Sequence, residues 1–169
     1  FFIFGEGFAI DKAGETKAMR KIEGYVRDDQ GKPVMQGMLN FPLYGSVGEV
    51  MARGRPTQEL GERIRQMMKL HSDPHRMPSF LDNHDVDRFL KGSNEVALRQ
   101  SLVVIMTLPG IPTLYYGTEQ GFKEQRAAMF AAGYASGGKD HFDTQAPLYL
   151  FTKSLAQVRK QHRVFSRGV

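Results

Sequence analysis

The chain has 169 residues, of which 41% are hydrophobic and 24% are charged, and these proportions exclude a disordered or fibrous protein. It contains no cysteine, which excludes disulfides and thiolate metal sites but does not indicate a cellular compartment. Because no apolar run approaches the roughly 18 residues that a membrane-spanning helix requires, we expect no membrane span.

The net charge of +5 raises the question of nucleic-acid binding. Most lysines and arginines are scattered along the chain, and one dense cluster falls at the end of a predicted helix, where positive charge is favourable and usually solvated. This cluster consists of Arg159, Lys160, Arg163 and Arg167. We therefore expect no nucleic-acid partner.

The first half of the chain is predicted to contain two short strands and one clear helix. Residues 1–4 are all apolar and end at a glycine, a pattern typical of a strand buried on both faces. Residues 11–33 are expected to form a loop with at most a short helix, and residues 38–43 are a second strand candidate. Residues 57–70 have apolar side chains at helical spacing, with Thr57 as the expected cap. Because the chain starts without methionine inside an apolar run, we interpret it as part of a longer polypeptide.

The second half alternates strands and helices. A strand is predicted over residues 78–82, and a helix over residues 94–107 is apolar on nearly all sides, which indicates deep packing. A fourth strand is expected at residues 113–116, a long loop at 123–142 and a helix at 147–162. Short apolar strands that alternate with helices predict parallel βαβ units.

Acidic and polar side chains directly follow two of the predicted strands. Glu6 lies between two glycines after the first strand, and Asp82, Asn83, His84 and Asp85 follow the third. In a parallel α/β barrel the carboxyl ends of the strands meet at one face, so we expect Glu6 and Asp85 to converge there. Two carboxylates in one cleft suit cleavage of a glycosidic bond, in which one must donate a proton and the other stay ionised. The glycines beside Glu6 are expected to leave room for substrate.

Taken alone, this pattern leaves other interpretations open. Strand-end acids are found in many barrels, and Glu6 could instead be a loop carboxylate that caps a helix or pairs with an arginine. We expect Asp82 and Asp87 to be structural. The adjacent Tyr115 and Tyr116 could stack on a sugar, although packing in the barrel core is the favoured interpretation.

Several segments, in order along the chain, resemble those of the α-amylase family of glycoside hydrolases. They are residues 4–6 for the fifth strand, 40–44 for the sixth, 80–85 (FLDNHD) for the end of the seventh, 108–119 for the loop and eighth strand, and 147–160 for the eighth helix. The resemblance implies an α/β fold, a partial (β/α)8 TIM barrel that comprises strands five to eight with their helices. Residues 1–169 would then be the C-terminal half of the catalytic barrel.

The resemblance also implies a retaining hydrolysis of α-linked glucans or maltooligosaccharides. In this scheme Glu6 is the catalytic acid/base, and Asp85 is the catalytic group that stabilises the transition state. His84 donates a hydrogen bond to the same sugar, and Asn83 and Arg88 complete the expected substrate-binding set. The carbohydrate is the expected partner.

Part of the family pattern is missing from this sequence. The nucleophile of the family is an aspartate on the fourth strand, and neither that segment nor the Asn-His segment of the third strand is found here. We therefore expect the parent protein to be the enzyme and this chain alone to be inactive. The alternative is a non-catalytic amylase-like module that binds carbohydrate or partners. If the parent protein is an enzyme, it could also be a transglycosylase or a glucosidase.

No metal or cofactor is expected in this chain. His71, Asp73 and His75 lie close together in sequence but lack the spacing of metal ligands. The resemblance allows calcium in the intact enzyme, bound by other parts of the protein. A half barrel has two unpaired strand edges, so we also expect association with the missing N-terminal half barrel or self-association with another copy.

Overall fold

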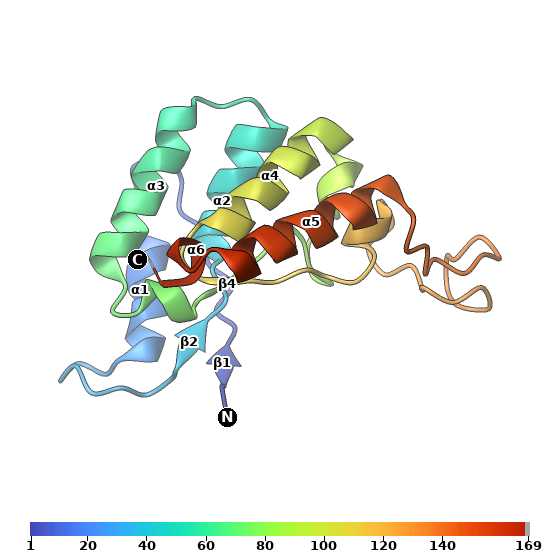
Figure 1. Cartoon of the computed structure of the whole chain (residues 1–169). Helices are drawn as coiled ribbons and strands as arrows, with labels where there is room; N and C mark the ends of the chain where they lie inside the picture. Colours follow the sequence, from blue (N-terminus) through green and yellow to red (C-terminus); the bar gives the residue numbers. More distant parts are fainter. Residues whose placement is uncertain (168–169) are drawn as a thin grey trace. The chain divides into compact units, whose positions relative to one another are not determined.

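The computed structural model describes residues 1–167 and separates into two compact units (Figure 1). The first unit contains Phe1–Ser79 and Pro109–Thr113, and the second contains Phe80–Leu108 and the chain from Leu114 onward. We describe each unit by itself. Among residues 1–167, no helix has both the length and the apolar character needed to cross a membrane.

The first unit holds four short parallel strands: β1 (Phe4–Gly5), β2 (Gly37–Met38), β3 (Pro78–Ser79) and β4 (Ile111–Pro112). β1 pairs with β2 and β3 pairs with β4, both in parallel. The amide of Asn40, after β2, donates a hydrogen bond of 2.9 Å to the carbonyl of Pro78 in β3. The strands therefore follow one another in chain order, and the predicted parallel arrangement is confirmed.

The strands are shorter than predicted, and two are displaced. Residues 1–4 are exposed, so the expectation of a strand buried on both faces is wrong; β1 is only two residues long and pairs with β2 alone. The expected strand at 113–116 is also wrong. There the amide of Thr113 still bonds to the carbonyl of Ser79, but the chain then turns into the short 3₁₀ helix η4 (Thr118–Gln120).

The second half of the second predicted strand, residues 41–43, is helical. α2 spans Phe41–Val47 and continues into a π-helical turn, η1 (Gly48–Ala52). The side chain of Asn40 accepts a hydrogen bond of 3.1 Å from the amide of Leu43, and Pro42 lies in the first turn. An asparagine cap followed by a proline is a helix start signal, and here it overrides the apolar pattern of a strand.

The other helices of the first unit are α1 (Lys17–Val26) and α3 (Thr57–Leu70). The predicted bounds of α3 are confirmed, but Thr57 does not cap it, because Pro56 occupies the cap position. α1 is a ten-residue helix inside the expected loop. Its first amides donate to Asp11, at 2.6 Å from Ala18 and 3.0 Å from Met19. The carboxylate of Asp11, several residues upstream, therefore accepts hydrogen bonds from the first turn of the helix.

The core of the first unit joins α1 to the strands. Ile22 and Val26 of α1 pack with Met38 of β2 and with Met77, which precedes β3. The helix therefore contacts the last residue of β2 and the residue before β3 through apolar side chains. Since burial of such side chains contributes about 1.5–3 kcal/mol each, this cluster fixes α1 against β2.

The second unit is built on α4 (Glu95–Thr107) and α5 (Pro147–Gln161), which pack against each other, with α6 (Val164–Arg167) after them (Figure 1). A short 3₁₀ helix, η3 (Phe89–Lys91), precedes α4. Both predicted long helices are confirmed within one residue. The expectation that α4 is packed all round is wrong, because Val96 and Val103 are exposed.

The segment between η4 and α5 contains no helix or strand, so the predicted loop over residues 123–142 is confirmed (orange in Figure 1). Within the basic cluster, Arg159 donates hydrogen bonds to the carbonyls of Met106 (2.7 Å) and Leu108 (3.1 Å). This arginine therefore holds α5 to the end of α4, which corrects the expectation of a solvated side chain for Arg159, whereas Lys160 and Arg163 are exposed as expected. The side chain of Arg167 lies outside the described residues.

Candidate active site

Glu6 lies in the first unit, directly after β1, and its side chain is exposed. The glycines on either side have a different role from the one expected. A Cβ atom at Gly5 would lie 2.7 Å from Sδ of Met38, and one at Gly7 would lie 3.2 Å from Cε2 of Tyr25. These glycines allow the chain to approach β2 and α1 closely, so the space that they leave is filled by protein.

Asp82 lies in the second unit and is buried. Its Oδ1 accepts a hydrogen bond of 2.8 Å from the hydroxyl of Thr118, and its Oδ2 accepts one of 3.0 Å from the amide of Phe89. Burial raises the pKa of the Asp82 carboxyl, and these hydrogen bonds together with the nearby Arg88 oppose the rise. These contacts agree with the structural role expected for Asp82.

The next three residues form a tight turn. Oδ1 of Asn83 accepts hydrogen bonds from the amides of Asp85 (2.8 Å) and Val86 (3.1 Å). His84 and Asp85 project from this turn as exposed side chains, with Nε2 of His84 3.2 Å from Oδ2 of Asp85. The amide side chain of Asn83 thus shapes the backbone, whereas His84 and Asp85 are accessible to a ligand.

Arg126 contacts this turn and was not predicted. Its Nε donates to the carbonyl of His84 at 3.0 Å, and its Nη2 lies 3.4 Å from Oδ1 of Asp85. Asp85 therefore has an imidazole on one oxygen and a guanidinium on the other. Arg126 is 41 residues away in sequence and belongs to an irregular loop, so no periodicity or motif could have linked it to Asp85.

Arg88 is almost completely buried, with 1% of its surface exposed. Its guanidinium carbon lies 4.0 Å from the centroid of the Tyr115 ring, and its nitrogens donate to the hydroxyl of Thr118 and to the carbonyl of Glu124, both at 3.3 Å. Nη1 is 3.9 Å from Oδ1 of Asp82. Within residues 1–167, Nη2 has no hydrogen-bond partner. Direct contact of Arg88 with a sugar stays a prediction.

Tyr115 connects buried Arg88 to exposed His84. Its ring centroid lies 6.3 Å from that of His84 and 4.5 Å from that of Tyr116, in an edge-to-face arrangement. Burial, together with a hydrogen bond to Tyr116, raises the pKa of Tyr115 to about 12, so its hydroxyl remains protonated at neutral pH. Tyr115 therefore packs as a neutral ring against the guanidinium.

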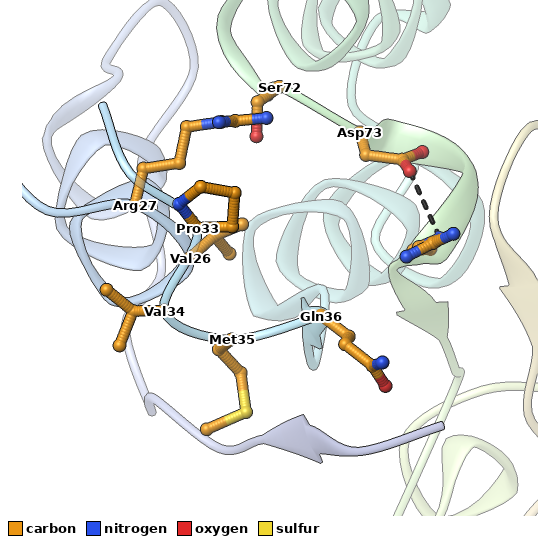
Figure 2. A pocket seen from close by; sticks show the side chains of 9 residues that line it. Val26, Arg27, Pro33, Val34, Met35, Gln36, Ser72 and Asp73 are labelled. Carbon is orange, nitrogen blue, oxygen red and sulfur yellow. Dashed lines mark ion pairs between the residues drawn. The ribbon is translucent and has the colours of Figure 1, made fainter. Parts of the chain in front are cut away.

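A pocket of about 260 Å³ lies in the first unit, on the amino-terminal side of β2 and β3 (Figure 2). Residues that precede β2 and β3 line it, among them Met35, Asp73 and Arg76, and the last two form an ion pair of 3.2 Å. In parallel barrels the amino-terminal ends of the strands contribute to stability, whereas the catalytic residues lie at the carboxyl ends. The pocket contains none of the predicted site residues.

The three residues considered as metal ligands do not form a cluster. Nδ1 of the buried His71 lies 3.0 Å from Oε2 of Glu23, and burial lowers the pKa of this histidine. Asp73 pairs with Arg76. Among residues 1–167, no group of three or more His, Cys, Asp or Glu side chains could hold a metal ion. The absence of a metal and of a cofactor stays a prediction.

Residues 14–142 match the sequence model of the family described as "Alpha amylase, catalytic domain". The chain belongs to this family. His84, Asp85 and Arg88 lie inside the matched range, and Glu6 lies before it. The resemblance seen in the separate sequence segments is thereby confirmed.

Two curated relatives cover 99% of this chain. A cyclomaltodextrin glucanotransferase from Thermoanaerobacterium thermosulfurigenes is 35% identical to it, and an alpha-amylase from Niallia circulans is 30% identical. The chain spans 22% of the first protein and 29% of the second. It is thus similar to a limited part of each relative.

Solved structures of α-amylases share the fold. The alpha-amylase of Geobacillus thermoleovorans, complexed with acarbose, has a TM-score of 0.74 and 27% identity, and covers 99% of this chain and 35% of its own. An Anoxybacillus alpha-amylase has a TM-score of 0.76 at 23% identity, with 99% and 34% covered. The α/β structure described above is therefore part of the TIM-barrel fold of these enzymes.

Proposed function

We propose that the protein to which this chain belongs is a retaining glycoside hydrolase that acts on α-linked glucans or maltooligosaccharides. The observation that carries the proposal is the exposed His84–Asp85 pair, which follows β3 in a chain of the α-amylase family. Relatives named alpha-amylase and cyclomaltodextrin glucanotransferase support a glucan substrate. The substrate class and the residue roles below belong to this proposal.

Within the proposal, residues 1–169 supply strands five to eight of the barrel. Four parallel strands in chain order support this assignment. The exposed apolar side chains of Phe1, Phe2, Ile3 and Phe4 would then pack against the remaining half of the barrel, or against a second copy of this chain. The nucleophile would come from the fourth strand, so the isolated chain would not hydrolyse glycosides.

In this scheme the aspartate of the fourth strand would take the glycosyl unit as the glycosidic bond breaks, and the part of the chemistry that this chain supplies divides between two carboxyl groups. Glu6 protonates the oxygen of the leaving sugar as the glycosidic bond breaks, and later takes a proton from the water that releases the product. Asp85 accepts hydrogen bonds from sugar hydroxyls, and its negative charge stabilises the positive charge of the oxocarbenium-like transition state. His84 donates a hydrogen bond to the same sugar. Arg126 holds the Asp85 carboxylate in place through its contact at 3.4 Å.

Replacement of the acid/base group tests the proposal. In the full-length protein, we expect Glu6→Gln to reduce turnover of maltoheptaose by about 10²–10⁴-fold, because proton transfer is lost, while maltoheptaose still binds. Glu49→Gln is the matched control, since Glu49 is an exposed glutamate paired with Arg53 on the surface. Turnover near that of the wild type in Glu6→Gln would refute the role of Glu6. Binding of glucan without any turnover by the wild-type protein would favour the non-catalytic module.

Transfer of the glycosyl unit to another sugar is the second candidate reaction. It is favoured by the 35% identical relative named as a glucanotransferase. Analysis of the products formed from maltoheptaose separates the two reactions. Hydrolysis yields shorter linear oligosaccharides only, whereas transfer also yields longer or cyclic products.

A further inference from the structure

The pocket in the first unit is lined by two short segments of the chain (Figure 2). Residues 26–36 run from the last residue of α1 to the start of β2, and residues 72–76 lie between α3 and β3. Pockets for drug-sized molecules enclose about 300–1,000 Å³, so a volume of about 260 Å³ suits a smaller ligand. Every lining residue belongs to the first unit, and none takes part in the chemistry proposed above.

The first of these segments is a hairpin that holds its own shape. Arg27 and Pro33 form an antiparallel bridge. Next to it, the amide of Val34 donates a hydrogen bond of 2.8 Å to the carbonyl of Val26. At the tip, Oδ1 of Asp28 accepts hydrogen bonds of 2.8 and 3.0 Å from two amides of the turn. A ligand therefore meets a wall that is already folded, which lowers the ordering cost of binding.

One side of the pocket is apolar. Val34 is 64% exposed beside it, and Met35 is half-buried and packs against the core of the unit. Val26 and Pro33 extend the same surface (Figure 2). A ligand that covers these side chains removes apolar surface from water, which favours binding. The lining thus favours a ligand with an apolar body over an inorganic ion.

The charged groups of the pocket leave an excess of positive charge. Within residues 1–167, its lining contains two arginines, Arg27 and Arg76, and one carboxylate, Asp73. Nη1 of Arg27 donates to the carbonyl of Gly31 at 2.8 Å, which fixes this side chain on the hairpin. Arg76 uses Nε for its ion pair of 3.2 Å with Asp73, so its two Nη atoms are outside that pair. One guanidinium charge is therefore not balanced by a lining carboxylate.

The acidic side chains that flank the pocket in sequence do not line it. Asp28 and Asp29 lie at the tip of the hairpin, where the first is bound to the amides of the turn. Glu23 of α1 accepts a hydrogen bond of 3.1 Å from the amide of Ser72, and its other oxygen lies 3.0 Å from Nδ1 of His71. These carboxylates thus leave the arginines of the pocket accessible to an anion.

We propose that this pocket binds a small organic carboxylate whose apolar body is about the size of a six-membered ring. The two arginines attract the carboxylate and donate charge-assisted hydrogen bonds to it, and the body lies against Val34 and Met35. A single negative charge matches the single unbalanced guanidinium charge, whereas a phosphate ester would bring about −1.5 to −2 charges. The inference goes beyond the proposed function, because it concerns a different ligand and residues outside the candidate active site.

Benzoate is the probe, and its binding to the full-length protein is followed by a ligand-detected NMR titration. We expect a dissociation constant on the order of 1 mM, as suits a small ligand with few contacts. Arg27→Met and Arg76→Met should each weaken binding by about tenfold, because each removes one positive charge. Arg53→Met is the matched control for Arg76, since Arg53 is an exposed arginine of the same unit that pairs with Glu49 as Arg76 pairs with Asp73.

Two further ligands separate the roles of charge and apolar body. Benzyl alcohol has the ring without the charge, and acetate has the charge without the ring, so each should bind about tenfold more weakly than benzoate or worse. Val34→Ser removes apolar surface from the pocket and should weaken benzoate binding by about threefold.

The proposal is overturned if benzoate shows no saturable binding at about 10 mM, or if both arginine variants bind it as well as the wild type does. Equal affinities for benzoate and acetate would refute the apolar body and with it the ligand class. Arg76→Met leaves the contact of Arg27 with the hairpin intact, so a loss confined to Arg27→Met would indicate a distorted hairpin and count against the proposal. Because no glucan enters this experiment, it can fail independently of the maltoheptaose test.

Discussion

Among residues 1–166, each unit contains one buried arginine, and the two are stabilised in different ways. Arg63 of α3 is 2% exposed and donates hydrogen bonds to the carbonyls of Lys12 and Glu15, both at 2.8 Å, and to the hydroxyl of Ser46 at 3.0 Å. Its Nη1 also lies 3.5 Å from Oδ2 of Asp11. Arg88 makes fewer and longer hydrogen bonds, and its guanidinium lies 4.0 Å from the Tyr115 ring and 5.6 Å from the Phe122 ring.

This difference shows two solutions to the cost of burying a charge. At Arg63, hydrogen-bond acceptors replace water almost completely, and the segment that starts α1 is thereby fixed to α3. At Arg88, aromatic faces replace part of the water, and one nitrogen is left without a partner within residues 1–167. The first arrangement is a structural anchor. The second packs against Tyr115, whose ring lies 6.3 Å from that of His84.

The largest effect is expected for Arg63→Met in the full-length protein. It leaves Asp11 buried without its cation and several acceptors unpaired, so the free energy of unfolding should fall by about 3–5 kcal/mol. Urea unfolding followed by circular dichroism measures this change. Arg65→Met is the matched control on the same helix, since Arg65 is exposed and its loss should change stability by about 0.5 kcal/mol or less. A loss at Arg63 no larger than at Arg65 would contradict the anchor role.

A smaller effect is expected for Arg88→Met, about 1–3 kcal/mol, because the methionine side chain still packs against the rings and Asp82 keeps its two other hydrogen bonds. The same urea experiment compares it directly with Arg63→Met. Arg88→Lys keeps the charge but not the flat stacking group, and should recover only part of the loss. If Arg88→Met destabilised the protein as much as Arg63→Met, the contrast between the two sites would be wrong.

The smallest effect is the change of the unfolding free energy with pH. We expect it to have opposite signs for His71 in the first unit and Asp82 in the second. Burial lowers the pKa of His71 below 6.5, so its contribution to stability is present above pH 6.5 and is lost as the pH falls through the lowered value. Burial raises the pKa of Asp82 above 3.8, so its contribution is present below pH 3.8 and is lost as the pH rises through the raised value.

Unfolding free energies measured across pH for the wild type, His71→Asn and Asp82→Asn test these signs. Subtracting each variant from the wild type isolates the contribution of that group from those of the other titrating residues. For His71 the difference should increase with pH, and for Asp82 it should decrease. The same sign for both groups would contradict the assignment of burial as the dominant cause.

The sequence predicted elements well where a signal is local and repeated. The spacing of Leu60, Ile64 and Met67 sets the bounds of α3, and Asn94 marks the start of α4 through a bond to the amide of Ala97. It failed where two local signals compete, as at Asn40–Leu43, where an apolar run indicates a strand but the cap and proline start a helix. Strand lengths were overestimated, because a strand extends only as far as it pairs with a neighbouring strand. The sequence alone does not show how far that pairing extends.

The residues of the candidate site were likewise predicted where the signal is local and missed where it is not. The order of residue types in 80–85 was sufficient to suggest the family and to select His84 and Asp85, because a short turn presents adjacent side chains together. The contacts of Arg126 with Asp85 and of Arg88 with Tyr115 join residues that lie far apart in the sequence. No period or motif encodes such distances.

By itself, the sequence determined the α/β class, the parallel strand order, the long helices and the family, because these depend on local periodicity and on short runs of residue types. Only the tertiary structure decided which polar groups are buried and which are presented to solvent. Asp82 and Asp85 are three positions apart and chemically identical, yet packing buries the first under Phe89 and Thr118 and leaves the second exposed beside His84. That difference depends on which distant segments exclude water, and it is fixed only when the chain folds.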